Sequence, residues 1–527
     1  MNIFIGLSWP YANGEFHIGH LGSSIPADII ARYYRLKGHD VCFVSGSDCY
    51  GTPISIQAQK ENRKPSEIAE FYHEKFVDVL EKLQFSFDNY TKTTSENHIS
   101  FAQNFHKNLY EGDYVYTKEE KRLFCEHCNR FLPDRYVEGT CPVCGSHSRG
   151  DACEKCGKIL EPEDLLKPQC GLCSSTPIFK DNFQYCIALS KLENKLKNFF
   201  YENKANWSTN AINLTERYFS EGLLDRTISR DLDWGVAVPK DNLKDKVIYN
   251  WGENVLGYIA GCKEYCEKKN INFKEWFNCE NSKHIYIHAK DNIQFHTIIY
   301  PALLLASKDC YHLPDEIFAY EFVTNEGQKI SKSKGTNLSA RELLENYDVD
   351  FLRFYFAKNI SDKKDLDFRL KDLISVVNGE LINNWGNFVN RTLSFIKNKF
   401  DGKISCCEID FEIEIKIKNT FENVEKLIKC GKVSNALREI CELVDFSNKF
   451  FNETQPWNVL KTDKKGCEKL CYQYLTLIAN LAILLNPFIP KGSEKVLFWL
   501  NVELKEYGFK KLNNTFITDF APLYTRI

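Results

Sequence analysis

The sequence predicts an α/β fold of parallel strands, interrupted by a small cysteine-rich insertion and followed by a bundle of α-helices. Three observations support this prediction. Strand and helix patterns alternate from residue 2 to about residue 110, cysteines gather between about residues 115 and 182, and amphipathic helical periodicity dominates from residue 373 to residue 527. Because 527 residues exceed what one hydrophobic core accommodates, we expect several structural units.

Composition and charge are those of a globular protein, with 43% hydrophobic and 26% charged residues, which excludes a disordered or fibrous chain. The net charge of −3 does not attract nucleic acid, so any RNA contact depends on local groups of Lys and Arg. The N-terminus lacks the pattern of a signal peptide. The longest apolar run, Leu475–Pro490, contains Asn480 and Asn486 and is too short for a membrane span. We therefore expect a buried helix there, no membrane association and a cytoplasmic protein.

The first predicted strand, Asn2–Leu7, is an apolar run that leads through the turn Pro10–Gly14 into a predicted helix, Leu21–Leu36. The segment His17-Ile18-Gly19-His20 lies at the start of this helix. Helix N-terminal amides and the helix dipole favour anions. The strand, turn and helix therefore predict the phosphate-binding end of a Rossmann-type domain.

The following segments continue the alternation. Asp40–Val44 is the second predicted strand, and Pro65–Leu83 has helical periodicity. Helical patterns are expected from Phe183 onward, and α/β character returns at Arg230–Trp234. Later elements are expected as strands at Lys246–Tyr258, His284–Ile287 and Leu313–Val323, a helix at Ala340–Ala357, and a bundle in which Val433, Ala436, Leu437, Ile440 and Val444 share one face.

A second phosphate-binding segment is expected at Lys329-Ile330-Ser331-Lys332-Ser333, a cationic stretch with Gly335 behind it. Such a loop is suited to close over the phosphates held by the first segment. Alone, each segment is also compatible with a simpler interpretation, a hydrogen-bonded histidine pair in a turn or a solvated lysine face. Their occurrence in one chain favours a nucleotide site.

Four Cys-x-x-Cys pairs fall within fifty residues and predict metal binding. Zinc takes four tetrahedral thiolates, so eight ligands predict two structural ions. The chain has 21 cysteines and no expected secretion signal, which favours reduced thiols over disulfides. Spacing alone leaves three pairings open for the four pairs, which are Cys125/Cys128, Cys141/Cys144, Cys153/Cys156 and Cys170/Cys173.

Several motifs resemble those of class I aminoacyl-tRNA synthetases, in which the lysine segment usually reads Lys-Met-Ser-Lys-Ser. Further segments resemble the methionyl-tRNA synthetase family over essentially the whole chain: Leu7–Gly14, Gly46–Ile54, Ile228–Asp231, Val247–Trp251, Ala289–Asn292 and Phe295-His296. The resemblance implies a Rossmann-type class I catalytic domain. It also implies a ligase that activates L-methionine with ATP to methionyl-adenylate and pyrophosphate, then transfers methionyl to the 3′-terminal adenosine of tRNA(Met).

The resemblance organises the chain into five predicted regions. These are the first half of the catalytic domain (1–114), a connective insertion with zinc knuckles (115–227), the second half of the catalytic domain (228–323), the lysine loop with a stem-contact region (324–372), and an α-helical anticodon-binding bundle (373–527).

Site roles follow from the same resemblance. Catalytic roles are implied for His17, His20, Lys329 and Lys332. ATP would be bound, together with Mg²⁺, by Tyr11, Asn13, Gly19, Arg230, Asp291 and Lys332. A pocket for the apolar, polarisable methionine side chain should be walled by aromatic rings with a few polar groups. The implied pocket residues are Ser8, Trp9, Asp48, Trp251, Tyr258 and His296, with Asp48 holding the α-ammonium.

Some positions depart from the common family pattern and bear on amino-acid specificity. Tyr50 stands where His often follows the aspartate, Asn254-Val255 where Ala-Pro is frequent, Ala289 where Gly is usual, and Trp9 where Leu is typical. Trp9 is expected to narrow the pocket. Two alternatives therefore stay open: a class I synthetase of altered amino-acid specificity, and a nucleotide- or RNA-binding paralogue that does not charge tRNA.

The resemblance also bears on the metals and on tRNA. Synthetases of this type with a single zinc bind it at the positions of Cys141, Cys144, Cys153 and Cys156, so Cys125, Cys128, Cys170 and Cys173 would share a second ion. In the bundle, Asn387 and Arg391 are four residues apart on one helix face, and Trp457 follows a proline. These three residues would read the anticodon, with Trp457 stacking on a base. A monomer is expected.

Overall fold

A parallel sheet forms the centre of the catalytic part of the chain. The computed structural model describes residues 1–527 apart from 151–152, 154, 159, 244, 278–280 and 330–337. The sheet has the order β14-β13-β1-β2-β3 and all of its pairs are parallel. Its strands are β1 (Asn2–Leu7), β2 (Asp40–Ser47), β3 (Asn89–Lys92), β13 (Ser282–Ala289) and β14 (Glu316–Tyr320). The predicted α/β fold is confirmed.

Helices cover both faces of this sheet, which explains why its strands are nearly continuous apolar runs. Ile3, Ile5 and Leu7 of β1 pack in one core with α1 (Ile18–Leu36) and α12 (Val349–Asn359). Phe4 points to the opposite core with α8 (Gly257–Lys269). The period of two along β1 therefore separates two hydrophobic clusters, one for each face.

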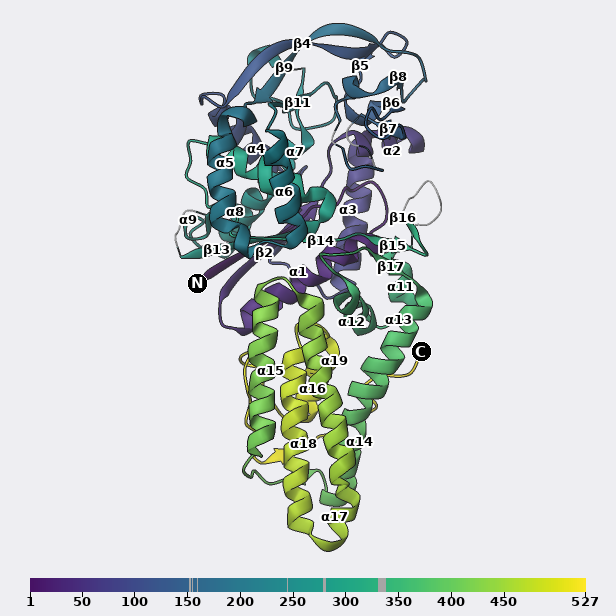
Figure 1. Cartoon of the computed structure of the whole chain (residues 1–527), viewed down its shortest axis with the longest axis vertical. Helices are drawn as coiled ribbons and strands as arrows, with labels where there is room; N and C mark the ends of the chain where they lie inside the picture. Colours follow the sequence, from purple (N-terminus) through teal and green to yellow (C-terminus); the bar gives the residue numbers. More distant parts are fainter. Residues whose placement is uncertain (151–152, 154, 159, 244, 278–280, 330–337) are drawn as a thin grey trace.

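The remaining elements of the catalytic part surround this sheet (Figure 1). Its helices are α2 (Thr52–Glu61), α3 (Pro65–Lys82), α4 (Glu96–Leu109), α5 (Leu189–Asn203), α6 (Thr209–Glu221), α7 (Asn250–Glu253), α9 (Lys274–Phe277), α10 (Tyr300–Ala306), α11 (Ala340–Asn346) and α13 (Leu370–Val376). Its short strands are β10 (Arg226–Thr227), β11 (Ser229–Arg230), β12 (Val247–Ile248), β15 (Val323–Asn325), β16 (Gln328–Lys329) and β17 (Leu366–Phe368).

The cysteine-rich insertion is carried on a long antiparallel pair of strands. β4 (Val115–Cys125) pairs with β9 (Ile178–Ile187) over ten residues, from Val115↔Ile187 to Phe124↔Ile178. This pair arches over the end of the molecule away from the bundle (Figure 1). The segment between its two strands contains β5 (Arg130–Phe131), β6 (Val137–Thr140), β7 (His147–Arg149) and β8 (Leu166–Cys170).

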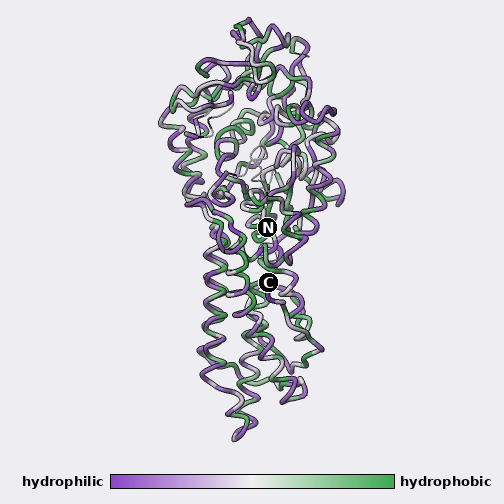
Figure 2. The backbone as a smooth tube through the Cα atoms, turned by 90° about the vertical axis from the view of Figure 1, so that its right-hand side faces the viewer, coloured by the Kyte–Doolittle hydropathy of each residue, from purple (hydrophilic) through white to green (hydrophobic). Residues whose placement is uncertain are grey.

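The bundle extends from the opposite side of the sheet (Figure 1). It consists of α14 (Asn387–Phe400), α15 (Phe411–Lys429), α16 (Val433–Thr454), α17 (Pro456–Thr462), α18 (Lys464–Leu485) and α19 (Pro490–Trp499), with a short strand pair β18 (Lys403–Ile404) and β19 (Thr515–Phe516). The predicted face of α16 is buried, and the bundle helices alternate hydrophilic and hydrophobic turns in Figure 2. None of the helices among the described residues is long and apolar enough to cross a membrane.

Three predicted elements are wrong. Residues 246–258 form a strand only at Val247–Ile248, because Val255, Ile259 and Cys262 recur at helical spacing and are buried in the core that contains α8. The helix expected from Phe183 begins at Leu189, since β9 continues to Ile187 along its ladder with β4. The single helix expected over residues 340–357 is two, and the side chain of Asp348 caps the second.

A buried ion pair joins the sheet layer to the bundle. The fully buried Arg353 of α12 donates to Asp28 of α1 at 2.7 Å and to the carbonyl oxygens of Phe488 and Pro487, which connect α18 to α19. Burial alone raises the pKa of Asp28, but Arg353 and Arg32 outweigh it and lower this pKa to about 2. One guanidinium thus holds three elements that are far apart in sequence.

Replacing Arg353 tests whether this ion pair stabilises the contact between the sheet layer and the bundle. Arg353→Met leaves the Asp28 carboxylate buried beside Arg32 alone, and uncompensated buried charge costs about 3–5 kcal/mol. We expect a clear fall in the thermal unfolding midpoint. Arg217→Met, which removes an exposed pair with Glu221, is the control and is expected to leave the midpoint nearly unchanged. Equal midpoints for the two variants would contradict the assignment.

Candidate functional site

The His17 turn begins α1 at the carboxyl end of β1. His17 is the N-cap: its Nδ1 accepts from the amide of Gly19 at 3.1 Å, and Nδ1 of His20 accepts from the amide of His17 at 3.0 Å. The two rings stack with centroids 3.8 Å apart. Because each Nδ1 is an acceptor, each neutral imidazole carries its proton on Nε2. The turn therefore presents two imidazole N–H groups at a helix N-terminus, where anions bind favourably.

The chain that follows the predicted lysine segment is attached to this turn. The amide of Ile18 donates to the carbonyl of Leu338 at 3.1 Å, and the amide of Ala340 donates to the carbonyl of Phe16 at 2.8 Å. Lys329 belongs to β16, where it pairs with Thr324. Lys332 lies outside the described residues. The His17 turn is thus joined through backbone hydrogen bonds to Leu338 and Ala340, more than three hundred residues later in the chain.

Asp48 lies at the end of β2, next to the turn that follows β1. Its amide donates to the carbonyl of Pro10, and its carbonyl accepts from the amide of Ala12. The carboxylate is fully buried and accepts from Nδ2 of Asn250 at 2.7 Å. Burial raises the pKa of Asp48, and the nearby charge of Glu253 raises it further. This is a carboxylate placed where it gains from a cationic partner.

Tyr258 and His296 form a second buried polar pair. The hydroxyl of Tyr258 lies 2.7 Å from Nε2 of His296, whose Nδ1 lies 2.9 Å from the carbonyl of Asn292. Burial lowers the pKa of His296 to about 4, so the ring is neutral at pH 7. Since Nδ1–H must donate to the carbonyl, Nε2 accepts the proton of the tyrosine hydroxyl. The pair is therefore polar but uncharged.

Two glycines make room for the indole of Trp9. A Cβ on Gly46 would come within 2.5 Å of the indole ring, and a Cβ on Gly257 within 2.7 Å. Trp9 is 4% exposed and packs in the same core as Tyr258. The indole therefore occupies a slot between β2 and the start of α8. The expected narrowing of the pocket by Trp9 stays a prediction.

An open cavity lies beside these buried groups. Tyr11, Trp251 and Arg230 share its wall with Tyr50, Trp234 and Asn250. The ring of Trp251 stacks on Phe295 at 3.7 Å with an interplanar angle of 2°. A flat aromatic wall next to charged and amide groups suits a ligand with both apolar and polar parts.

Arg230, which lines this cavity, is held in place by an ion pair and by contact with an aromatic ring. Its Nε lies 3.0 Å from both carboxylate oxygens of Asp134, and its guanidinium carbon lies 3.8 Å from the centre of the Tyr249 ring. Burial on its own lowers the pKa of Arg230, but Asp134 and Glu161 outweigh it and raise the pKa. The guanidinium is thus permanently charged and held in one orientation.

The remaining predicted residues occupy the same edge of the sheet. Asn13 belongs to the turn between β1 and α1, and Gly19 lies in the first turn of α1. Ser8 directly follows β1, and its amide donates to the carbonyl of Ile287 in β13. Asp291 follows β13 on an exposed turn. In a parallel sheet whose order reverses at β1, this edge is where ligands bind.

The eight predicted cysteines form two separate clusters in the nested arrangement. The sulfur atoms of Cys125 and Cys173 are 3.5 Å apart and those of Cys128 and Cys170 are 3.9 Å apart; the inner cluster has 3.9 Å for Cys141 to Cys156 and 3.5 Å for Cys144 to Cys153. A tetrahedron with metal–sulfur bonds of 2.3 Å has edges of about 3.8 Å. Each cluster therefore has the donors and the spacing of a zinc site.

The backbone repeats one turn at each of these pairs. The residue after the second cysteine has a positive φ in every case: Asn129, Gly145, Gly157 and Ser174. At Gly145 and Gly157 the amide donates to the carbonyl of the first cysteine, at 3.0 and 2.9 Å. This turn directs both sulfur atoms to the same point, which a metal ligand pair requires.

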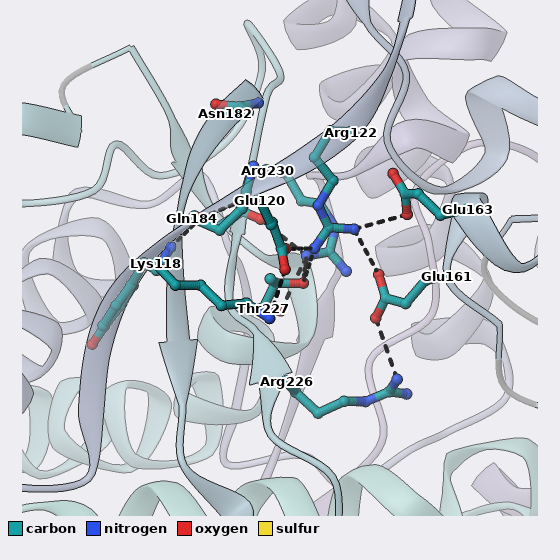
Figure 3. A network of polar contacts seen from close by, with 12 residues as sticks. Lys118, Glu120, Arg122, Glu161, Glu163, Asn182, Gln184, Arg226, Thr227 and Arg230 are labelled. Carbon is teal, nitrogen blue, oxygen red and sulfur yellow. Dashed lines mark hydrogen bonds and ion pairs between the residues drawn. The ribbon is translucent and has the colours of Figure 1, made fainter. Parts of the chain in front are cut away.

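A network of ion pairs holds the cysteine-rich insertion against the long strand β4 that carries it (Figure 3). Arg122 of β4 donates to Glu163 at 2.9 Å and to Glu161 at 3.3 Å, and both glutamates lie between Cys156 and Cys170 in sequence. Glu161 also accepts from Arg226 of β10 at 3.2 Å. Arg122 and Arg226 thus hold this segment of the insertion against β4 and β10.

In the bundle, Phe451 lies between the predicted anticodon residues Arg391 and Trp457. Asn387 is exposed at the start of α14, one turn before Arg391. The guanidinium carbon of Arg391 lies 4.3 Å from the centre of the Phe451 ring, which lies 6.1 Å from that of Trp457. Trp457 is 44% exposed near the start of α17, the outermost helix in Figure 1. An exposed aromatic ring beside a cation suits stacking with an unpaired base.

Two family models match the chain. One, described as tRNA synthetases class I (M), matches residues 3–393, and the other, described as the anticodon binding domain of methionyl tRNA ligase, matches residues 405–518. The chain belongs to the methionyl-tRNA synthetase family. The first model ends within α14 and the second begins before α15, so their boundary falls inside the predicted bundle.

Individual relatives agree with this family assignment. Methionine–tRNA ligase 1 of Alkaliphilus oremlandii is 42% identical over the whole chain and 97% of its own length, and the methionine–tRNA ligase of Streptococcus pneumoniae is 41% identical with the same coverage. A solved methionyl-tRNA synthetase of Mycobacterium tuberculosis in complex with methionyl-adenylate has a TM-score of 0.83 at 23% identity, covering all of both chains, which shows the shared fold. The predicted activity of a methionine–tRNA ligase is confirmed.

Sequence reasoning missed the residues that hold the predicted ones in place. Asn250 bonds Asp48, Asp134 bonds Arg230, and Phe295 stacks on Trp251. Asn250 and Phe295 stand within motifs of the methionyl-tRNA synthetase family. The sequence therefore marked these two positions as candidates, but it did not indicate which residues they contact. Asp134 lies 96 residues from Arg230, and nothing local indicates this pairing.

The slot for Trp9 gives a test of pocket shape. Gly257→Ala places a methyl group against the indole, and overpacking costs about 1–3 kcal/mol. We expect the variant to raise KM for methionine in pyrophosphate exchange. Trp9→Leu in the same chain should recover most of this loss, because the smaller side chain removes the clash.

Gly379→Ala is the matched control, because a Cβ there meets no atom within 4 Å. It is expected to leave the methionine KM unchanged. A Gly257→Ala variant that behaves like this control, or a double variant no better than Gly257→Ala, would contradict the assignment.

Proposed function

We propose that the carboxyl edge of the central sheet is the place where this methionine–tRNA ligase forms methionyl-adenylate. The observation that carries the proposal is the position of Asn250, which donates to the Asp48 carboxylate and to the hydroxyl of Tyr11 and lines the cavity beside Trp251. Attack of a carboxylate on the α-phosphorus of ATP needs no covalent enzyme intermediate. It needs two substrates held in line and cationic or N–H donors on the phosphates.

The amino acid is proposed to bind with its ammonium on Asp48. Its thioether then faces the uncharged pair Tyr258 and His296, with Trp251, Trp9 and Ser8 as walls. Support comes from the chemistry of these groups, since a buried carboxylate is stabilised by a cation and an apolar side chain by neutral rings. This arrangement directs the carboxylate of methionine toward the His17 turn.

ATP is proposed to bind across the same turn. The Nε2–H groups of His17 and His20 donate to its phosphates, while Tyr11, Asn13 and Gly19 contact it through the turn. Arg230 and Asp291 orient the nucleotide, and Lys329 and Lys332 close over the triphosphate. Mg²⁺ bound with ATP would offset the phosphate charge. Pyrophosphate then leaves, and the methionyl group passes to the 3′-terminal adenosine of tRNA(Met).

The bundle is proposed to read the anticodon of that tRNA. Trp457 would stack on a base, and Asn387 and Arg391 would bond base edges. The two cysteine clusters are proposed to hold structural zinc, because four thiolates leave no position for a substrate. Thiolates that must stay reduced suit a cytoplasmic protein. A monomeric state stays a prediction.

The amino-acid and tRNA specificity can be tested together. Pyrophosphate exchange across a panel of amino acids should respond to methionine first, and charging of purified tRNAs should select tRNA(Met). Trp457→Ala is expected to spare exchange but weaken charging by about 1–3 kcal/mol in kcat/KM for tRNA, the value of one stacked base.

Phe498→Ala, which removes another exposed aromatic ring of the bundle, is the control and should leave both activities unchanged. Exchange that prefers another amino acid would support an altered synthetase. Exchange without charging of any tRNA would support the non-charging paralogue. Equal loss of exchange and charging in Trp457→Ala would assign the ring to the core.

Metal content tests the cysteine clusters. The purified chain should hold about two zinc ions, since each cluster has four thiolates. Cys128→Ser and Cys144→Ser each weaken one cluster, so each variant should retain about one zinc and the double variant about none. A content near zero in the unchanged chain would overturn the metal assignment, and loss of both ions from either single variant would show that the clusters are not independent.

A further inference from the structure

A second buried carboxylate lies next to the proposed ammonium site. Glu253 of α7 is fully buried, three residues after the Asn250 that donates to Asp48. Its Oε2 lies 2.5 Å from Nε2 of His98 in α4. Nothing in the adenylate chemistry described above uses Glu253 or His98, yet a buried carboxylate is costly unless it has a partner of opposite charge.

Several polar atoms around this carboxylate have no hydrogen-bond partner within the described part of the chain. They belong to side chains that are at most 7% exposed: Oε1 of Glu253, Oδ1 of Asn250, Nδ2 of Asn254 and Nε1 of Trp9. Asn250 lines the cavity beside Trp251. Unpaired buried polar atoms each cost about 1–3 kcal/mol, so their concentration here indicates a place that receives a polar group of the substrate.

Among the residues that the structure describes, the groups that face Glu253 include no permanently charged cation. His98 faces it from α4, and burial lowers the pKa of His98 to about 3, so this imidazole is neutral. From the end of β2 it is faced by Asp48 and Tyr50, and burial together with the charge of Glu253 raises the pKa of both. Burial likewise raises the pKa of Glu253 itself. Two carboxylates in such a place do not both ionise.

We propose that Glu253 is a positioning residue of the ammonium site, which shares one proton with Asp48 until the ammonium of methionine enters and expels that proton to solvent. The proposal rests on the proposed role of Asp48. In the step, one carboxyl O–H bond breaks and its proton passes to buffer. The ammonium then stands between two carboxylates, one held by Asn250 and the other by His98.

The sign of the pH dependence follows from this exchange. Methionine binds the form in which Asp48 and Glu253 are both ionised. Its affinity is therefore highest above the raised apparent pKa of this pair and falls as the pH drops below that pKa. In the pH range where methionine binding releases one proton, KM for methionine rises by about tenfold for each unit by which the pH is lowered. A lone carboxylate with an ordinary pKa would show this fall only near pH 4.

The test measures protons and methionine affinity from about pH 5.5 to about pH 8.5. Calorimetry of methionine binding to the full chain, in two buffers of different ionisation enthalpy, counts the protons released. We expect up to about one proton per methionine for the unchanged chain, and a methionine KM in pyrophosphate exchange that rises toward low pH. Absence of both effects would overturn the proposal without any variant.

Glu253→Gln removes the shared proton while keeping the shape of the side chain. It should release fewer protons, flatten the pH profile of the methionine KM, and raise this KM at high pH by about fivefold or more. Glu267→Gln, on the exposed side of α8, is the control and should change none of these. A purely structural role would lower the unfolding midpoint of Glu253→Gln but keep the shape of its pH profile, which would contradict the proposal.

Asp48→Asn separates this inference from the function on which it rests. A near-normal methionine KM in Asp48→Asn would remove Asp48 from the ammonium site, and the proposal would fall with it. A large rise for Asp48→Asn, together with an unchanged proton count and pH profile for Glu253→Gln, would refute the role of Glu253 alone.

Discussion

The parallel pairing of β1 with β2 on one side and β13 on the other is the constraint on which the site depends. Parallel strands bring their carboxyl ends to one edge, and the chain leaves that edge in opposite directions on either side of β1. The turns after these three strands supply the His17 turn, Asp48 and Asp291. Because side chains alternate along β1, the same strand also separates the two hydrophobic cores that hold the covering helices.

Charge at this edge is controlled by burial and by fixed partners. Asp134 holds Arg230, Asn250 holds Asp48, and the Tyr258–His296 pair is kept neutral. Each group is therefore oriented before any substrate arrives, which reduces the rearrangement required in the reaction. The same arrangement leaves polar atoms unsatisfied near Glu253, so part of the stability of the fold is given up where methionine is proposed to bind.

The sequence was sufficient where a pattern is local and regular. The run Asn2–Leu7 predicted β1, the four Cys-x-x-Cys pairs predicted the metal module, and the spacing from Val433 to Val444 predicted the buried face of α16. It failed over residues 246–258, where buried apolar residues that suit a strand also suit a helix. Contacts between distant segments, such as Arg353 with Asp28, depend on the assembled fold and left no local signal.

The cysteine-rich insertion between β4 and β9 is connected to the catalytic part through one pair of strands. Val115 and Ile187, its first and last paired residues, lie directly opposite each other on β4 and β9. The chain thus departs from and returns to the catalytic part at a single point. Changes in length within the insertion therefore need not shift the register of the central sheet, as long as Asp134 keeps its place beside Arg230.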